Sequence, residues 1–464
     1  MKRTKREYSK SIFGDLRLDR RLEQVCERLC SQMNATVPEA SVAWKAAKGT
    51  YRLWDNGCVT PDRQVSYYFN SRIRPLLESR PDCRRVLQIS DTMELDYTHH
   101  RCAAQLGPLS HAKQRGLHLH NSLLTNNLGH PLGLLQQTYH VRLDELFGQS
   151  VQRAHVPLRE KESARWLQHF QTGQELCRQD PALEVVFIAD READILELFA
   201  QRSQANMHFV IRSRHDRKLA DGMCNLVTSV NGWPAAGRLR TKVFNRKTRK
   251  WRDAQLEIRF GAAQIKLHHT LPHKRHLPAI PLHVVDIKEI TPSVESEERI
   301  HWRLLTTLAV QTMAEAFVVF QYYLLRWLIE RFHFLLKSGG ASVEKLQLAT
   351  PQRLKNAITT YSIAAMDAFN LRYLCENNPD EPIFNVGISP IEYQVLYTYA
   401  QKQLKLKVKY DPESPPTVRQ YCITLGQIAG FFPSKRQPVP GLVILTRALE
   451  KLQHFVDAYL TFCQ

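Results

Sequence analysis

The sequence lacks the features that mark several common protein classes. Its ten cysteines form no CxxC pair and have no regular spacing, which argues against a zinc knuckle and favours reduced thiols. The opening MKRTKREYSK is too charged for a secretory signal. The apolar runs, the longest around residues 316–325, are too short and too interrupted to span a bilayer. These absences predict a cytoplasmic protein without a membrane-spanning segment.

Acidic residues are also in the minority. The chain has 464 residues, and 64 Lys and Arg against 45 Asp and Glu give it a net charge of +19. An excess of this size predicts a polyanionic partner, most simply nucleic acid, with a basic protein that has no such role as the alternative. The length predicts two to four domains, and the 43% of hydrophobic residues are enough for a sizeable core.

Patterning divides the chain into three segments. Residues 1–70 carry basic helical patterns, which suit a DNA-binding module and equally suit a basic packing domain. Residues 71–372 alternate strand and helix patterns, which predicts an α/β core. Within it, residues 222–300 show Lys- and Arg-rich hairpin patterns, so we expect an all-β insertion there. After CENNPDEP, residues 373–464 return to helices.

The last helical segment carries an apolar seam with three- and four-residue spacing. Its members are Leu442, Leu445, Leu449, Leu452, Val456 and Tyr459. A seam of this kind packs against another helix. Spacing alone fits dimerisation and packing within one chain about equally, so both interpretations stay open.

Two aspartates follow strand patterns. Asp91 lies in ISDTMELDY, and Asp190 lies in ADREADI after a buried run. Active sites of α/β proteins gather where strands end, so we expect both aspartates there. A lone aspartate after a strand is more often a helix cap, and Asp190 opens a helical pattern, so capping is a strong alternative for it.

The stretch YYLLRWLIERFHFLLK at 322–337 supplies a third carboxylate. On a helical wheel, Arg326, Glu330 and Lys337 share a stripe roughly 60° wide with Tyr323, while apolar residues cover the rest. A helix that is apolar on most sides is normally buried, and burying unpaired charge is costly. Some cation must therefore balance Glu330.

A magnesium site would supply that cation. Three carboxylates converging on a sheet edge provide the oxygen ligands that Mg²⁺ prefers. A pair of such ions promotes in-line phosphoryl transfer. We therefore expect Glu330 to be balanced by metal, and Arg326, Lys337 and the Tyr323 hydroxyl to be matched by DNA phosphates.

These motifs resemble the bacterial cut-and-paste transposases of the insertion-sequence-four family. The resemblance rests on Asp91 in ISDTMELDY, on ADREADI, and on the Tyr-x2-Arg-x3-Glu-x6-Lys spacing from Tyr323 to Lys337. It extends over most of the chain through FGDLRLDRRL, AAKGTYRLWDN, EKESARWL, FVIRSRHDRK, WRLLTT and GFFPSKR. The match is loose in the N-terminal segment outside its two short blocks, and poor beyond 375 until GFFPSKR.

The resemblance implies a role for each matching residue. It implies that Asp91, Asp190 and Glu330 form the catalytic, metal-binding triad. It also implies contacts to DNA phosphates and to a flipped base by Tyr323, Arg326, Lys337, Arg212, Arg214 and Trp302. For Trp302 a core aromatic on a strand is the alternative. Arg191, Glu192 and Asp194 complete the signature, with a structural role as their alternative.

The resemblance further implies a ribonuclease-H-like catalytic core with an all-β insertion, flanked by a helical domain that binds transposon ends and a helical dimerisation domain. The implied cofactor is two Mg²⁺ ions, with Mn²⁺ as a substitute. The implied reaction nicks a transposon end, forms and reopens a hairpin, and joins the freed 3′-hydroxyl to target DNA. The implied partners are DNA ends, target DNA and a second copy of the chain, in a bacterial nucleoid.

Two other functions fit parts of the sequence. A DNA-binding protein that has lost cleavage would keep the basic segments, but the three carboxylates and the helix motif are all present. A structure-specific nuclease would share the core, but it needs neither end recognition nor pairing of ends. Near the first aspartate, Glu94 and Asp96 are additional carboxylates that the family pattern does not require.

Overall fold

The computed structural model describes most of the chain. The described residues are 11–41, 43–79, 84–148, 161–201, 205–220, 222, 224–245, 248, 250–266, 279–291 and 299–462. Among them, no helix combines the length and apolar character needed to cross a membrane. The cysteines in these ranges are free thiols.

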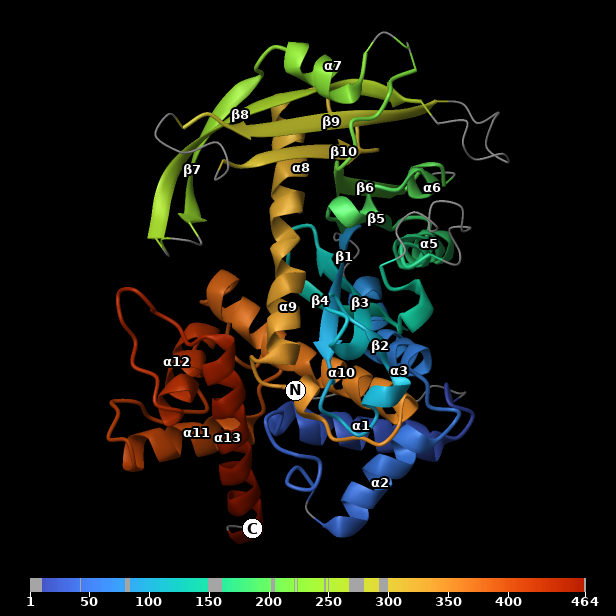
Figure 1. The fold of residues 1–464 in the computed structure, drawn as a ribbon. Coiled ribbons are helices and arrows are strands. Elements are labelled where there is room, and N and C mark those ends of the chain that lie inside the picture. Colours follow the sequence, from blue (N-terminus) through green and yellow to red (C-terminus); the bar gives the residue numbers. More distant parts are fainter. Residues whose placement is uncertain are drawn as a thin grey trace.

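One mixed sheet organises the described part of the molecule (Figure 1). Its strands are β1 (Arg85–Asp96), β2 (Gly107–Pro108), β3 (Arg115–Asn126), β4 (Pro131–His140), β5 (Glu184–Ala189), β6 (Met207–Arg212), β7 (Gly237–Asn245), β8 (Lys250–Ile265), β9 (Ile280–Glu289) and β10 (His301–Thr306). They follow the order β2-β3-β1-β5-β6-β10-β9-β8-β7, with β4 also paired to β3. The predicted combination of strands and helices is confirmed.

Strand directions divide the sheet into two parts. β4, β3 and β1 form an antiparallel meander, and β5 and β6 continue from β1 in parallel. β10 then pairs antiparallel with β6, and β9, β8 and β7 extend the sheet in antiparallel fashion. The parallel centre is apolar on both faces because helices cover both sides of it; in β5 the run Val185–Ile188 is fully buried.

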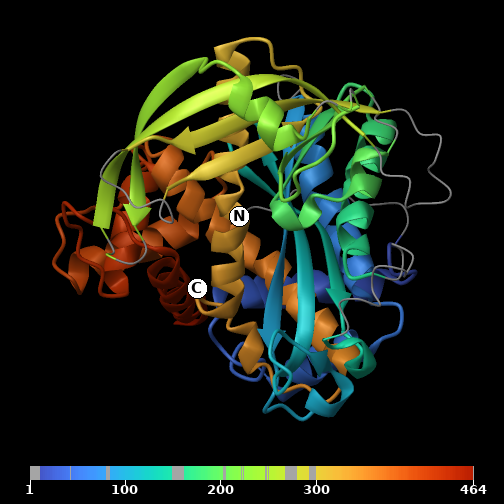
Figure 2. The same ribbon diagram turned by 45° about the horizontal axis from the view of Figure 1, so that its top comes forward.

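Helices α8 (Met313–Leu325) and α9 (Trp327–Lys337) form a rod along the sheet (Figures 1 and 2). The sequence predicted one continuous helix here. The structure instead has two helices that meet at Arg326, which is both the last cap of α8 and the first cap of α9. α8 contacts β5, β6 and β9, whereas α9 contacts β1 and β3. On the other side of the sheet lies α5 (Ala164–Gln179) (Figure 2).

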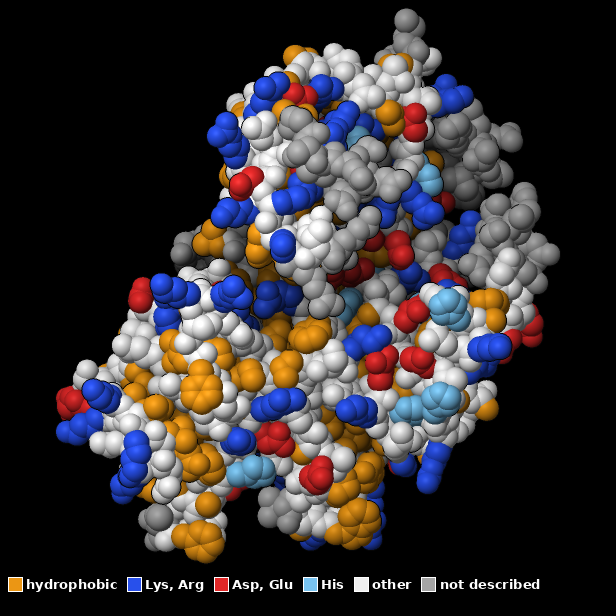
Figure 3. Space-filling model, turned by 60° about the vertical axis from the view of Figure 1, so that its left-hand side comes forward, with side chains coloured by type: hydrophobic (Ala, Val, Ile, Leu, Met, Phe, Trp, Pro, Cys, Tyr) orange, Lys and Arg blue, Asp and Glu red, His pale blue; other side chains and the backbone are white. Residues whose placement is uncertain are grey.

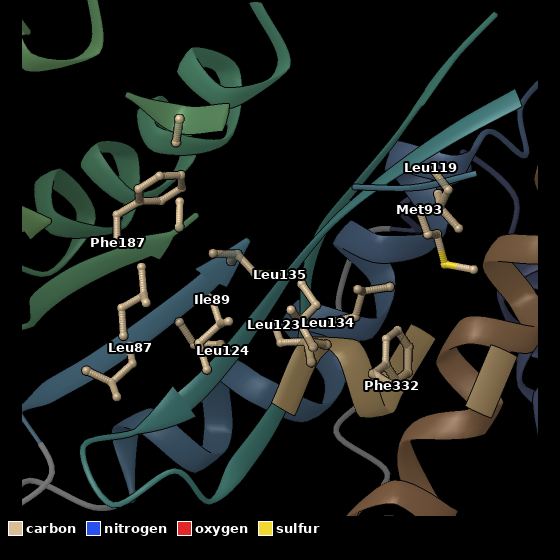
Figure 4. Packing of buried hydrophobic residues seen from close by; sticks show 14 of the residues in the cluster. Leu87, Ile89, Met93, Leu119, Leu123, Leu124, Leu134, Leu135, Phe187 and Phe332 are labelled. Atoms are coloured by element: carbon tan, nitrogen blue, oxygen red, sulfur yellow. The ribbon is translucent and has the colours of Figure 1, made fainter. Parts of the chain in front are cut away.

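Apolar side chains of these layers meet in one core. Figure 4 shows part of it, in which Phe332 of α9 belongs to the same buried cluster as a set of strand residues. That set consists of Leu87, Ile89 and Met93 of β1, Leu119, Leu123 and Leu124 of β3, Leu134 and Leu135 of β4, and Phe187 of β5. The α9 helix therefore has a fixed position against β1.

The segment predicted as an all-β insertion differs from that prediction in two ways. Besides β7, β8 and β9 it contains the helix α7 (Leu226–Gly232). Its strands also join the main sheet, because β9 pairs with β10 along its length. The insertion therefore enlarges the core sheet and contains a helix.

The N-terminal helices pack on the same core as the sheet. They are α1 (Leu16–Ser31), α2 (Trp44–Asp55), α3 (Pro61–Tyr68), a π-helical turn (Phe69–Ile73) and α4 (Arg74–Glu78). α1, α2 and α3 contact the long helix α10 (Pro351–Asn377). On α2 the apolar face is buried, while Lys45, Lys48 and Arg52 are exposed.

The C-terminal helices have a core of their own. They are α11 (Pro390–Lys402), α12 (Val418–Ile428) and α13 (Leu442–Phe462). α10 runs through residue 372, where the sequence placed a domain boundary, and this second core begins at Leu371. In the α13 seam, Leu445 and Leu452 are buried against α11 and α12. Packing within the chain therefore accounts for the seam.

Shorter elements complete the fold. They are the short helix α6 (Leu196–Phe199) and the 3₁₀ turns η2 (Ala103–Gln105), η3 (Asp144–Leu146), η6 (Arg191–Ala193) and η9 (Val343–Lys345). η6 follows β5 directly, so it carries the ADREADI motif to the edge of the parallel strands.

Candidate functional site

The two aspartates lie side by side on neighbouring strands. The parallel register pairs Ile89 of β1 with Ile188 of β5, so Asp91 and Asp190 occupy equivalent positions two residues further along. Asp190 follows the end of β5, as predicted. Asp91 does not end its strand, because β1 continues to Asp96 and pairs Asp91 with Asn121 of β3. The prediction that both aspartates mark strand ends is therefore wrong for Asp91.

Helix α9 places Glu330 near Asp91, and the side chain of Arg326 connects the two carboxylates. The Arg326 guanidinium donates from Nη1 to Asp91 Oδ2 at 3.2 Å and from Nη2 to Glu330 Oε1. Arg326 and Glu330 are one helical turn apart, a spacing that places oppositely charged side chains together. Figure 3 shows acidic side chains in a recess between the upper β layer and the lower helical part, with Lys and Arg around it.

Arg326 pairs with two of the carboxylates in this structure, a pairing that the sequence analysis did not predict. The sequence analysis expected metal to balance Glu330 and DNA phosphates to match Arg326. In this structure Arg326 balances both Glu330 and Asp91. Its guanidinium also lies over the ring of Tyr323, 6.0 Å from the centroid.

The electrostatics of Asp91 are unusual for an aspartate. Burial raises its pKa, Arg326 lowers it, and the nearby carboxylates of Asp190 and Glu330 raise it again, to about 7. Its Oδ1 accepts a hydrogen bond from the Thr92 backbone N–H at 2.8 Å. Burial is the largest cause of this raised pKa, and the charge of Arg326 offsets only part of it.

Asp190 also caps the start of η6, the alternative role that the sequence analysis gave it. Its Oδ1 accepts a hydrogen bond from the Glu192 backbone N–H at 2.9 Å, at the start of η6. A capping carboxylate in this position has further lone pairs available. Capping and ligand binding are therefore compatible for Asp190.

Asp194 is structural in this conformation. Its side chain is fully buried and accepts hydrogen bonds from the backbone N–H groups of Arg214 (2.7 Å) and His215 (3.0 Å). The guanidinium of Arg217 binds it as well, from Nε at 3.0 Å and from Nη2. Asp194 thus fixes the loop that follows β6, which agrees with the structural alternative.

Tyr323 and Arg212 meet beside the carboxylates. Tyr323 is 5% exposed, and burial raises the pKa of its hydroxyl. Burial lowers the pKa of Arg212 and the Tyr323 hydroxyl partly offsets this, while Arg212 Nη2 donates to the His301 carbonyl at 3.0 Å. The Arg214 side chain is exposed in the following loop.

Trp302 and Lys337 have partners within the chain. Trp302 is partly buried, and its ring centroid lies 5.2 Å from that of Tyr323 and 6.0 Å from that of Phe320. Lys337 Nζ donates to the Glu94 carbonyl at 3.0 Å and lies 3.1 Å from Glu344 Oε1. Seven residues separate Lys337 from Glu330, about 10 Å along a helix, so Lys337 lies outside the carboxylate cluster.

The two additional carboxylates of β1 face other partners. Glu94 accepts a hydrogen bond from Ser110 Oγ at 2.7 Å and lies 3.2 Å from His118 Nε2. Asp96 accepts from the Thr98 backbone N–H at 2.9 Å. Neither contributes to the shift in the pKa of Asp91.

The sequence analysis missed the residues that support the site. Arg165 Nε donates to Thr92 Oγ1 at 3.0 Å, and its Nη2 donates to Glu192 Oε2 at 3.1 Å. Arg165 therefore ties the residue after Asp91 to the motif that contains Asp190. The block EKESARWL, which contains Arg165, was the available signal.

A buried histidine lies beneath Glu330 on α9. His333 Nε2 accepts a hydrogen bond from Asn121 Nδ2 at 3.0 Å. Burial and, to a smaller extent, the positive charges of Arg326 and Lys337 lower the pKa of His333 to about 3. His333 is therefore neutral and adds no positive charge beneath the carboxylates.

The chemistry of the three carboxylates fits divalent metal, although their present spacing does not form a coordination site. Clustered carboxylate oxygens are the ligands that divalent cations such as Mg²⁺ prefer. Within the described ranges, no group of three or more His, Cys, Asp or Glu side chains is arranged to hold a metal ion. In this structure the cation between Asp91 and Glu330 is Arg326.

Comparison with known proteins adds a match at the N-terminus. Residues 2–59 match the family model described as Transposase DNA-binding. The match supports a DNA-binding transposase. Its described part includes α1 and α2, with the exposed basic residues of α2. Among solved structures, the chain is similar to a piggyBac transposase synaptic complex with hairpin DNA, at 10% identity and a TM-score of 0.35, covering 98% of this chain and 76% of that chain.

Proposed function

We propose that the chain is a metal-dependent DNA transposase whose catalytic triad is Asp91, Asp190 and Glu330. We further propose that it is of the insertion-sequence-four type, on the strength of its resemblance to transposases such as that of transposon five. The observation that carries the proposal is the proximity of three carboxylates that are distant in sequence. Arg326 binds Asp91 and Glu330, and the charge of Asp190 acts on Asp91. The transposase DNA-binding match at residues 2–59 supports the same assignment.

The strand order supports a ribonuclease-H-like core. An antiparallel meander of β4, β3 and β1 continues into the parallel strands β5 and β6. In this arrangement the first aspartate lies on the central strand and the second follows its parallel neighbour. The added strands β7, β8 and β9 precede β10 and α8 in the chain, and the next helix, α9, carries the glutamate that completes the proposed triad.

Mg²⁺ is the proposed cofactor, with Mn²⁺ as a substitute, and Asp91, Asp190 and Glu330 would hold it. When bound, two such ions stabilise the attacking and leaving oxygens of an in-line phosphoryl transfer. The chain's own residues position these groups. Arg165 fixes Thr92 against Glu192, and Asn121 fixes His333 beneath Glu330. Arg326 neutralises the carboxylates until DNA supplies phosphates for its guanidinium.

DNA would be held on both sides of the carboxylates. The exposed Lys45, Lys48 and Arg52 of α2 form a basic face suited to duplex DNA. Nearer the triad, Arg212, Arg214, Tyr323 and Lys337 would contact the phosphates of the cleaved strand. Trp302, which is partly exposed beside Tyr323, would stack on a base removed from the duplex.

The proposed reaction has four phosphoryl transfers. Water attacks a phosphodiester at the transposon end and frees a 3′-hydroxyl. This hydroxyl attacks the opposite strand and closes a hairpin, which water then reopens. The regenerated 3′-hydroxyl joins a target strand. We propose that two copies of the chain hold the paired ends during these steps.

The test uses linear DNA bearing the inverted repeats that flank the gene, with Mg²⁺ or Mn²⁺. We expect hairpin-ended excision products from the wild-type protein and none from Asp190→Ala. Asp180→Ala, an exposed aspartate before β5 that pairs with Arg84 at 3.4 Å, is the matched control and should retain cleavage. Cleavage that persists in Asp190→Ala would overturn the assignment.

A DNA-binding protein without cleavage is the second candidate. The observation that favours it is the position of Arg326, which binds two of the three carboxylates directly. Specific binding of the inverted repeats without cutting, in either metal and over a range of pH, would support this candidate over the transposase.

A further inference from the structure

A basic segment follows helix α11 in the C-terminal part of the chain. It carries four exposed lysines, Lys402, Lys405, Lys407 and Lys409. Residues 393–410 include no Asp or Glu. None of the four lysines forms an ion pair or hydrogen bond with another described residue, whereas Lys337 pairs with a glutamate of the chain. Positive charge that the chain leaves unpaired favours an anionic partner.

The segment has an inward and an outward face. Lys405, Lys407 and Lys409 are exposed, whereas the alternate residues Val408 and Tyr410 pack against the second core. Side chains two residues apart along an extended chain point to the same side. The three lysines therefore form one outward row of positive charge, which the apolar residues between them hold against the protein.

Contacts at both ends fix the backbone of this row. At its start, the Leu406 N–H donates to the Ala400 carbonyl of α11 at 3.1 Å. At its end, the Tyr393 hydroxyl of α11 donates to the Asp411 carbonyl at 3.1 Å and accepts from the Asp411 N–H at 3.0 Å. The ring of Tyr410 also lies 4.8 Å from that of Tyr393. The lysines are thus presented by an anchored segment.

Lys405 has a backbone conformation that a lysine rarely adopts. Its φ is 54°, in the left-handed region that favours glycine, because glycine has no Cβ. Among the described residues, Ser342 is the only other non-glycine residue with a positive φ. Such residues cost free energy and cluster at functional sites. A lysine where glycine would be less strained indicates that its side chain is used.

We propose that Lys405, Lys407 and Lys409 bind the phosphate backbone of duplex DNA outside the inverted repeats, whatever its sequence. This inference rests on the proposed function and goes beyond it, because the DNA contacts assigned there lie on α2 and around the carboxylates. Lysine binds phosphate as a point charge. Contacts to phosphates position DNA without reading its sequence.

The first test measures the affinity of the full chain for a duplex of unrelated sequence at several salt concentrations. Replacing all three lysines by glutamine should weaken binding about ten- to hundredfold at about 0.1 M salt. It should also reduce the slope of log affinity against log salt by about two to three, because each lost phosphate contact removes about 0.9. Replacing the same three lysines by arginine keeps the charge and is the matched control, which should bind as the wild type does.

A second comparison locates the contact relative to the inverted repeat. Adding flanking duplex DNA to an inverted-repeat duplex should strengthen binding by the wild-type protein and have little effect on the triple glutamine variant. An equal gain in both proteins would show that these lysines do not bind the flanking DNA.

Lys405→Gly separates the role of the side chain from that of the backbone. Glycine relieves the left-handed strain, so the unfolding temperature should rise. The salt slope for the unrelated duplex should nevertheless fall by about one, because one phosphate contact is lost. A rise in the unfolding temperature with an unchanged salt slope would show that the Lys405 side chain does not bind DNA.

Lysine acetylation, read by mass spectrometry, tests the contact without substitutions. DNA should protect Lys405, Lys407 and Lys409 from the reagent. Lys451 is the reference in the same part of the chain, because its Nζ donates to the Ile428 carbonyl at 3.2 Å, and its reaction should not change with DNA. Equal acetylation of the three lysines with and without DNA would contradict the proposal.

The outcomes separate this inference from the proposed function. If the triple glutamine variant binds every duplex as the wild type does, the segment is not a DNA contact, although the transposase assignment stands. If the wild-type protein binds no DNA at all, the proposed function fails together with the inference.

Discussion

Asp190 and Asp194 lie four residues apart in the ADREADI segment, and their carboxylates have very different surroundings. Asp194 is fully buried, and two backbone N–H groups and Arg217 bind it. Asp190 keeps one backbone donor and adds its charge to those of Asp91 and Glu330, which share only Arg326. Donors thus saturate the cluster around Asp194, whereas the cluster of Asp91, Asp190 and Glu330 is under-compensated, because three carboxylates have one neighbouring arginine between them.

The difference separates structural carboxylates from functional ones. A buried carboxylate that only supports a fold is normally surrounded by donors, because an uncompensated charge is costly. Carboxylates that lie close together and share a single cation instead indicate a site built for an added cation. By this criterion, Asp190 belongs to the candidate site and Asp194 to its framework.

The largest expected effect comes from removing a member of the under-compensated cluster. Asp190→Ala should lower the rate of DNA strand cleavage by about 10⁴-fold. Its free energy of unfolding should change by no more than about 1 kcal/mol, because the lost cap is offset by weaker repulsion from Asp91. Single-turnover cleavage and urea unfolding measure the two quantities. A large loss of stability would instead make Asp190 a framework residue.

The saturated cluster should respond in the opposite way. Asp194→Ala leaves the buried Arg217 guanidinium without its carboxylate, so we expect a loss of about 3–5 kcal/mol of stability. Asp15→Ala, which removes an exposed pair with Arg17, serves as the comparison and should cost far less. If Asp194→Ala unfolds at the same urea concentration as the wild type, the two clusters do not differ as described.

The pKa of Asp91 predicts how stability depends on pH. Its folded pKa is about 7, raised from the ordinary aspartate value of 3.8, so between these values the folded state binds more protons than the unfolded state. Stability contributed by this group is therefore present at low pH and lost as pH rises through 7. Relative to wild type, Asp91→Asn should gain on the order of 3 kcal/mol between pH 4 and pH 8.

The measurement compares urea unfolding of both proteins without DNA or metal at several pH values. A constant difference between them from pH 4 to pH 8 would show that Asp91 is fully ionised in the folded protein. In that case Arg326 alone would compensate the three carboxylates.

The smallest effect is expected for Glu192, an exposed residue of the same ADREADI segment. Glu192 is exposed and pairs with Arg165 at 3.1 Å. Exposed ion pairs contribute little to stability, so Glu192→Gln should change the free energy of unfolding by less than about 0.5 kcal/mol. Thermal unfolding at matched salt checks this. A larger loss would mean that Arg165 depends on Glu192 to hold Thr92.

Part of this arrangement could be predicted from the sequence. The run Val185–Ile188 is apolar enough to indicate a strand buried on both faces, and Asp190 follows it with a capping pattern. The helical period of 322–337 placed Arg326 and Glu330 on one face. That spacing of four residues was also a signal for their pairing, which the sequence analysis attributed to metal and DNA instead.

Other features depend on tertiary contacts. β1 continues past Asp91 because Met93 and Leu95 alternate with polar residues, a two-residue period that the sequence analysis did not follow. The α13 seam looks the same whether its partner is another chain or α11 and α12. The ion pair between Arg303 and Asp286 results from the register of β10 against β9, and no local pattern reveals it.

The most direct test of the account is the number of Mn²⁺ ions bound by the protein on an inverted-repeat duplex, measured by electron paramagnetic resonance. We predict two ions per chain for the wild type and a loss of at least one in each of Asp91→Ala, Asp190→Ala and Glu330→Ala. Asp194 should not be needed for this binding, provided that its variant remains folded. Unchanged Mn²⁺ binding in all three carboxylate variants would contradict the claim that these side chains form one cation site.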